Sequence, residues 1–249
     1  RGQNNVQGAA DMGCQPHQGA GYFEVADKNN QKFYTEKYGV THPTKPGLKI
    51  PQMFEAAINK ELKGLWIIGE DIVQTDPNSA HVIEAMNSLE LLVVQEIFMS
   101  ETAKLATVVL PGTTFLEKDG TFTNTERRIQ RVNRAVPPLP GTKPDGLIVT
   151  EMMQKLGFDQ PTYDADQVLQ EIADVVPFFK GVTRERLGKL GLQWPVKEDG
   201  TDTQILHTES FKLGKGRLKN FDWKESSEIE ANQKDYPLIL TTSRVLQHY

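Results

Sequence analysis

Three short apolar runs, separated by helical patterns, constrain the fold of this chain more than any other feature. The runs are LWII, LLVV and TVVL, at residues 65–68, 91–94 and 107–110. Apolar residues recur at helical spacing between the first two runs, and Ser100 can cap a short helix between the last two. Continuous apolar strands that alternate with helices are typical of a parallel sheet covered on both faces by helices. The sequence therefore predicts an α/β fold.

The sequence also indicates where four of the helices lie. Residues 54–62 carry apolar side chains at helical spacing, and Asp76 followed by proline is a favourable helix start. Asp145 is predicted to cap another helix, and residues 165–176 form a fourth helical pattern. We expect these helices to flank the sheet.

Three polar stretches show no clear period. Residues 1–25 are rich in Gly, Asn, Gln and Ala, residues 26–50 have the composition of a connector, and residues 181–234 are charged and rich in predicted loops. Residues 121–123 alternate as an extended segment does, which suggests a hairpin.

Net charge argues against one class of partner. The formal charge is −5 and the isoelectric point is about 5.6, so no dominant basic face is expected to attract nucleic-acid phosphates. The basic cluster of Arg127, Arg128, Arg131 and Arg134 is flanked by acids and has few aromatic neighbours. It is more typical of a solvated face, or of pairing with acids from another domain.

The ends and the single cysteine suggest that the chain is part of a longer polypeptide. It begins at Arg1 and stops at Tyr249 inside a strand-like stretch. No apolar run is long enough to span a bilayer, and no signal peptide is visible. Cys14 alone supports neither an internal disulfide framework nor an iron–sulfur cluster built from this segment.

The carboxyl edge of the predicted sheet is the expected ligand site, because open parallel sheets bind ligands there. Asp71, Gln95 and Glu96 lie in the loops that this rule selects. Carboxylates at such places accept hydrogen bonds from ribose hydroxyls or a guanine edge. Helix starts explain Asp76 and Glu101 without a ligand. The chain lacks GxGxxG and Walker motifs, so an ordinary nicotinamide- or ATP-binding domain is disfavoured.

Four ordered motifs resemble the molybdopterin oxidoreductase superfamily of the DMSO reductase type, and within it the catalytic subunit of formate dehydrogenases. They are RGQNNVQGAADMG at residues 1–13, LWIIGEDIVQTDP at 65–77, VVQEIFMSETAKLATVVLP at 93–111 and EKDGTFTNTERRIQ at 117–130. The last segment, YPLILTTSRVLQHY, is similar to the opening of that family's C-terminal β-barrel domain.

The resemblance implies a set of site residues. Arg1 corresponds to an active-site arginine beside the metal, and such a side chain can hold formate in a bidentate pose. The implied cofactor contacts are Gln3, Glu70, Asp71, Thr75, Gln95, Glu96, Lys118 and Asp145. No metal ligand is expected in this chain.

The resemblance also implies cofactors and partners. It implies a bis-molybdopterin guanine dinucleotide cofactor with molybdenum or tungsten, and a [4Fe–4S] cluster in an N-terminal region that is not part of this sequence. Formate would be oxidised reversibly to carbon dioxide, and the electrons would pass to electron-transfer subunits or to a partner linked to ferredoxin or NAD(P). A cytoplasmic location is expected, with an upstream export signal left open.

The implied architecture has three parts. Residues 1–180 would form the C-terminal part of a molybdopterin-binding α/β domain with a Rossmann-like parallel sheet. Residues 181–234 would form a loop-rich connector, and residues 235–249 would begin a dinucleotide-binding β-barrel domain.

Three other interpretations remain open. One is a nitrate reductase-type enzyme of the same superfamily, which Arg1 in front of Gly-Gln disfavours. Another is a non-catalytic relative such as the large iron–sulfur subunit of respiratory complex I, which the presence of Gln3, Asp71, Gln95 and Lys118 disfavours. The third is a bare nucleotide-binding module.

Overall fold

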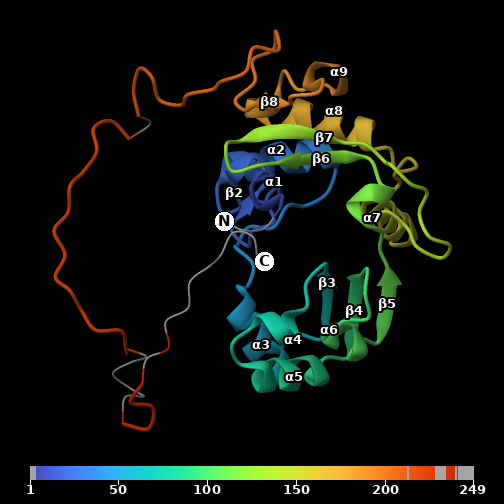
Figure 1. Ribbon diagram of the computed structural model, residues 1–249, viewed down its shortest axis with the longest axis vertical. Coiled ribbons are helices and arrows are strands. Elements are labelled where there is room, and N and C mark those ends of the chain that lie inside the picture. The colour runs from blue at the N-terminus through green and yellow to red at the C-terminus, as the bar shows by residue number, and fades with distance from the viewer. Residues whose placement is uncertain (1–3, 212, 228–233, 239, 241–249) are drawn as a thin grey trace.

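The computed structural model describes residues 4–211, 213–227, 234–238 and 240. Figure 1 shows two lobes, one built around strands β3 (Gly64–Ile68), β4 (Leu91–Glu96) and β5 (Val108–Pro111), the other containing the N-terminal helices and the later strands. Helix α7 (Asp145–Lys155) lies at one side, between the lobes. Within the described ranges, no helix has the length and apolar content needed to cross a membrane.

The predicted parallel sheet is confirmed. Among the described residues, β3, β4 and β5 pair in parallel in that order, with Ile67 opposite Val94 and Val94 opposite Val109. Side chains alternate between the faces of a strand, so these three residues point to the same side. That side faces the core of the lobe.

Four helices pack on this side: α3 (Ile50–Ile58), α4 (Ile72–Thr75), α5 (Ser79–Ser88) and α6 (Glu101–Lys104). Together with the sheet they enclose a buried core whose members are Phe54, Ala57, Ile67, Ile72, Val73, Val82, Ala85, Met86, Leu92, Val94 and Ala103. The apolar strand and helix patterns of the sequence meet in this core.

The opposite face of the sheet is covered only in part, whereas the sequence predicted cover on both faces. In the described part of the chain, Ile68, Leu91 and Val108 on that face are exposed, while Trp66 and Val93 are half-buried and Gln95 is buried. Crossovers between successive parallel strands are right-handed, so strands added in chain order place their connecting helices on a single side.

The other lobe contains the predicted hairpin. Strands β6 (Gly120–Thr123) and β7 (Arg128–Val132) pair antiparallel, and β8 (Leu192–Gln193) joins β7. The helices of this lobe are α1 (Val6–Asp11), α2 (Lys28–Tyr38), α8 (Ala165–Val175) and α9 (Arg184–Leu187). The remaining short elements are β1 (Gln18–Gly19), η1 (Ala20–Tyr22), β2 (Phe23–Glu24), η2 (Phe115–Glu117) and η3 (Pro177–Phe179).

A second core holds this lobe together. Its buried members are Ile129, Leu169, Val176, Phe179, Val182, Leu187 and Val196. The core therefore continues past residue 180, into the first part of the segment expected to be a connector. Beyond it, the described residues of the C-terminal segment 235–249 are Asp235–Leu238 and Leu240, and they form no strand; the others lie outside the described residues.

Two helix starts differ from the sequence prediction. Helix α5 begins at Ser79 with Asn78 as its cap, whose side chain accepts a hydrogen bond from the backbone N–H of His81. Helix α7 begins at Asp145, and Pro144 occupies its cap position. No side chain forms a capping hydrogen bond at this helix start. The prediction that Asp145 caps this helix was wrong, which leaves its carboxylate for other contacts.

Candidate functional site

The carboxyl ends of the parallel strands point toward the other lobe (Figure 1). Glu70 and Asp71 follow β3, Gln95 and Glu96 end β4, and Gly112 follows β5. The residues that the sequence placed at the carboxyl edge of the sheet therefore lie at the edge that is turned toward the other lobe.

Three of the predicted cofactor contacts meet at this edge. Gln95 Nε2 donates a hydrogen bond of 2.7 Å to Asp145 Oδ1. The Lys118 ammonium forms an ion pair with the other carboxylate oxygen of Asp145, and it also donates to the carbonyl of Thr113 at 3.3 Å. These side chains come from β4, from the loop after η2 and from the start of α7. The sequence motifs gave no direct indication of this mutual contact.

The position of Asp145 is fixed by close packing on both sides. A Cβ atom at Gly112 would lie 3.2 Å from Asp145 Oδ1. A Cβ atom at Gly146 would lie 2.2 Å from the ring of Tyr163. Glycine at these two positions lets β5 and the Tyr163 ring approach the start of α7.

Two buried oxygens of this cluster have no hydrogen-bond partner within the described part of the chain: Gln95 Oε1 and Thr113 Oγ1. Gln95 is 1% exposed and Thr113 is 3% exposed. A buried polar atom without a partner costs free energy, so such atoms often mark a place where a ligand completes the hydrogen bonding. An acid, a lysine, an amide and free acceptors provide the mixed donor and acceptor set that a nucleotide requires.

Asp71 is engaged in holding the lobe together. Its Oδ1 accepts hydrogen bonds from the backbone N–H of Thr102 at 3.0 Å and from the Thr102 hydroxyl at 2.7 Å. Its Oδ2 accepts from Gln74 Nε2 at 2.6 Å. Burial raises the pKa of Asp71, but the hydrogen bonds from Thr102, Gln74 and the backbone of Glu101 lower that pKa more, so it lies below its ordinary value. The carboxylate thus ties the loop after β3 to the start of α6.

The other predicted contacts of this edge have local partners. The Thr75 hydroxyl donates to Glu70 Oε1 at 2.5 Å. Glu96 Oε1 accepts from the backbone N–H of Ile97 at 2.7 Å. Glu70 and Thr75 are exposed. Arg1 and Gln3 lie outside the described residues.

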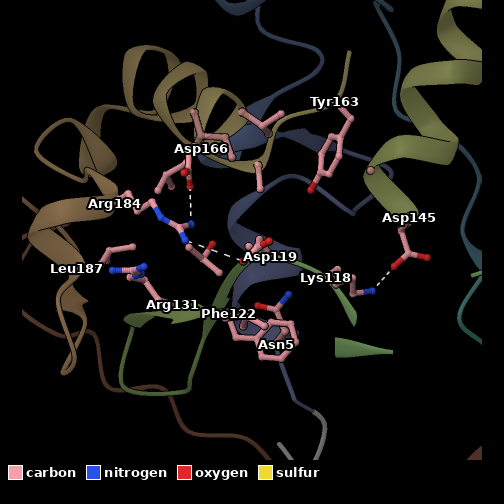
Figure 2. A pocket seen from close by; sticks show the side chains of 18 residues that line it. Asn5, Lys118, Asp119, Phe122, Arg131, Asp145, Tyr163, Asp166, Arg184 and Leu187 are labelled. Atoms are coloured by element: carbon pink, nitrogen blue, oxygen red, sulfur yellow. Dashed lines mark hydrogen bonds and ion pairs between the residues drawn. The ribbon is translucent and has the colours of Figure 1, made fainter. Parts of the chain in front are cut away.

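A cavity of about 270 Å³ adjoins the cluster. Figure 2 shows the Lys118 ammonium and the Asp145 carboxylate facing each other at one side of it, and Arg184 paired with Asp166 at the other. The hairpin residues Gly120–Phe122 and the side chain of Asn5 also line it. Residues of the first motif, of the fourth motif and of the stretch 145–187 therefore meet around this cavity.

Sequence reasoning missed several residues of this cavity. Tyr163 and Arg184 come from stretches without a motif, so no sequence signal indicated them. Burial raises the pKa of the Tyr163 hydroxyl, and the nearby carboxylates, first Asp145 and then Asp119, raise it further. Asn5 belongs to the RGQNN motif, which did provide a signal.

The basic cluster makes contacts within the chain. The Arg127 guanidinium donates to the carbonyls of Trp194, Thr203 and Gln204, and Arg128 donates to Gln193 Oε1 at 3.0 Å. In the described ranges, no group of three or more His, Cys, Asp or Glu side chains is arranged to hold a metal ion.

A family model described as "Molybdopterin oxidoreductase" matches residues 2–155. The F420-dependent formate dehydrogenase subunit alpha of Methanocaldococcus jannaschii is 43% identical over 252 residues, covering 100% of this chain and 37% of that protein. A putative formate dehydrogenase of Staphylococcus haemolyticus is 42% identical over 250 residues, covering 100% of this chain and 25% of that protein. The chain thus spans between a quarter and two fifths of the length of these relatives.

Structural comparison supports the fold. The acetylene hydratase from Pelobacter acetylenicus aligns with a TM-score of 0.57 at 19% identity, over 88% of this chain and 33% of that chain. At this identity the likeness concerns the fold alone.

Proposed function

The chain belongs to the molybdopterin oxidoreductase family, and we propose that it forms part of the site for a bis-molybdopterin guanine dinucleotide in an enzyme that oxidises formate to carbon dioxide. The observation that carries the cofactor proposal is the meeting of Gln95, Asp145 and Lys118 beside two free buried acceptors. The formate proposal is supported by the names of the relatives and by the RGQNN motif.

The residues fit one nucleotide arm of the cofactor. A guanine base has N–H groups that can donate hydrogen bonds to a carboxylate such as that of Asp145. A pyrophosphate is anionic and can form an ion pair with an ammonium such as that of Lys118. Gln95 Oε1 and Thr113 Oγ1 supply further hydrogen-bonding capacity. We propose that the cofactor is also contacted by Gln3, Glu70, Asp71, Thr75 and Glu96. Asp71 would in addition keep the loop after β3 in place for the cofactor, through its hydrogen bonds to Thr102.

The chemistry divides between the cofactor and the chain. When bound, the cofactor with its molybdenum or tungsten would accept the two electrons that are released as formate becomes carbon dioxide and a proton. Arg1 would hold the formate carboxylate through two parallel hydrogen bonds, because its guanidinium stays charged and presents a fixed fork of donors.

The remaining parts of the proposal concern the whole protein. Electrons would leave toward a [4Fe–4S] cluster and then to electron-transfer subunits or a partner linked to ferredoxin or NAD(P), in a cytoplasmic enzyme. Residues 1–180, 181–234 and 235–249 would belong to the α/β domain, a connector and the start of a β-barrel domain. The packing of Val182, Leu187 and Val196 in the second core favours a connector that begins later than residue 181.

The test is formate-dependent dye reduction by the full-length protein that carries this chain, isolated with its cofactor. Arg1→Lys keeps the charge but loses the bidentate fork, so we expect it to lose most of the activity, and Arg1→Ala to lose more. Nitrate is tested as the alternative substrate in the opposite direction, by oxidation of the reduced dye. Turnover of nitrate but not formate by a protein that contains metal and pterin would contradict the formate proposal, and absence of pterin would contradict the cofactor proposal.

A further inference from the structure

The start of helix α7, which carries Asp145, has little within the helix to hold it in place. Pro144 occupies the cap position, and no side chain forms a capping hydrogen bond there. The second residue of the helix is Gly146, and glycine disfavours helical structure relative to alanine. A helix start without a cap tends to fray. Gln95 and Lys118 hold the Asp145 carboxylate, so the backbone that carries it depends on contacts from outside the helix.

The ring of Tyr163 makes such a contact. A Cβ atom at Gly146 would lie 2.2 Å from one carbon of this ring and 2.4 Å from the next. Any larger residue at this position would therefore push the ring away from the helix. The close approach of the ring explains a glycine where the first turn of a helix would otherwise favour another residue.

Tyr163 is itself anchored to the other lobe, because it directly precedes the cap residue of α8. Asp164 caps α8 by accepting hydrogen bonds from the backbone N–H groups of Asp166 and Gln167, both at 2.9 Å. Farther along α8, Leu169 is buried in the second core. The ring of Tyr163 therefore links the position of α8 to the start of α7.

The contact is made by the ring and not by the hydroxyl. Figure 2 shows the Tyr163 hydroxyl turned toward the cavity. Within the described part of the chain, this hydroxyl forms no hydrogen bond. Burial and then the charge of Asp145 raise the pKa of the hydroxyl above its ordinary value. The side chain thus stays neutral and does not repel the carboxylate near it.

We propose that Tyr163 is a positioning residue for Asp145 in cofactor binding, acting through the contact of its ring with Gly146; this inference rests on the proposed function. Without the ring, the uncapped first turn of α7 would fray. Asp145 would then lose the geometry in which it meets Gln95 and Lys118. The site would hold the cofactor less tightly although all three contact residues are still present.

The test measures how fast the full-length holoenzyme loses its guanine nucleotide and metal during dialysis. Tyr163→Ala removes the ring, and we expect the loss to be about 5- to 10-fold faster, the scale of losing one helix cap. Tyr163→Phe keeps the ring and should lose the cofactor at the rate of the unsubstituted enzyme. Tyr38→Ala is the matched control, because it removes a tyrosine ring from α2 in the same lobe, where that ring stacks on Tyr34. It should leave the rate unchanged.

A second comparison separates positioning of Asp145 from general destabilisation. In an Asp145→Ala background the ring has no carboxylate left to position, so Tyr163→Ala should change the rate there by less than about twofold. A general loss of stability would speed the release by the same factor in both backgrounds.

Gly146→Ala decides the question if Tyr163→Ala does not fold. Its added Cβ would displace the ring from the helix start, so it should also speed the release of the cofactor. This effect too should appear only while Asp145 is present.

The outcomes separate the two proposals. If the unsubstituted enzyme carries no guanine nucleotide, the proposed cofactor site and this inference both fail. If it carries the nucleotide, two results overturn the inference alone. One is a decisive variant that releases the cofactor at the unsubstituted rate, or faster by the same factor with and without Asp145. The other is a loss in Tyr163→Phe as large as that in Tyr163→Ala, because the hydroxyl and not the ring would then be required.

Discussion

Gln95 and Asp145, which lie 50 residues apart, share a hydrogen bond of 2.7 Å that links the end of a parallel strand to the start of a helix between the two lobes. The bond aligns the carboxylate so that its other oxygen meets Lys118. One acidic residue outside the four motifs thereby connects the third motif, which contains Gln95, with the fourth, which contains Lys118.

Replacement of Asp145 should therefore weaken the cofactor site more than any change in the loop after β3. We expect Asp145→Ala to lower cofactor affinity about 10- to 100-fold, the effect of losing one or two charge-assisted hydrogen bonds. Guanine nucleotide and metal released per chain after denaturation measure it. Glu151→Gln is the matched control, because Glu151 lies on the same helix and pairs only with Lys143 at 2.6 Å among the contacts of the described residues. Equal loss in both variants would contradict the prediction.

The sequence predicted the members of this cluster but not their contact. The carboxyl-edge rule selected Gln95, and the resemblance selected Lys118 and Asp145, but a helix start offered a sufficient local explanation for Asp145. The structure shows Pro144 at the cap position instead. Contacts over such separations depend on how the lobes pack, which neither periodicity nor turn chemistry encodes.

Local patterns also failed where polar residues form helices. Residues 26–50 were expected to be a connector, yet they contain α2. Asp27 caps this helix by accepting from the backbone N–H groups of Asn29 and Asn30, and Gly39 ends it with φ of 68°. The ring of Tyr34 packs against neighbouring rings, including that of Phe33, and the centroids of these two rings lie 5.4 Å apart. Capping and aromatic contacts on a largely polar helix outweigh the weak apolar period that sequence reading relies on.

Thr102 should be a stability residue of the sheet lobe. Its hydroxyl donates to Asp71 Oδ1 at 2.7 Å and accepts from the backbone N–H of Val73 at 3.1 Å, and its side chain is 0% exposed. Thr102→Val keeps the shape, leaves the Val73 N–H without its acceptor and removes one of the hydrogen bonds that Asp71 accepts, so we expect a loss of about 1–3 kcal/mol in the free energy of unfolding. Urea unfolding measures it. Thr102→Ser keeps the hydroxyl and should lose less; a larger loss in the serine variant would contradict this role.

Glu117 should make the stability of the chain depend on pH. Its carboxylate accepts from the backbone N–H and hydroxyl of Thr114, both at 2.8 Å, and from the backbone N–H of Leu139 at 2.9 Å. These bonds, the Thr114 backbone bond first, lower the pKa of Glu117 in the folded state. A depressed folded pKa stabilises the fold above the unfolded pKa of about 4.3, and this contribution is lost as the pH falls through the folded value.

The matching experiment compares Glu117→Gln with the unsubstituted chain by urea unfolding across that range. The variant should be less stable near neutral pH, and the difference should shrink as the pH falls below about 4.3. Glu61→Gln, at an exposed position, should show little of this pH dependence. A difference for Glu117→Gln that stays constant with pH would indicate that the charge of the carboxylate does not matter.

Gly8 should be required for the contact between Asn5 and Thr123, although it lies inside a helix. Glycine to alanine within a helix usually stabilises a protein by about 1 kcal/mol. Here the added Cβ would lie 2.1 Å from Asn5 Oδ1 and would displace that oxygen from the Thr123 N–H, so we expect the opposite sign, a loss of about 1–3 kcal/mol. Gly64→Ala is the control, because its added Cβ would meet only ordinary contacts, the nearest at 3.6 Å. Because Asn5 holds the start of α1, Gly8→Ala should also speed amide exchange in that helix, and a stabilised Gly8→Ala variant would show that Asn5 does not fix α1 to the hairpin.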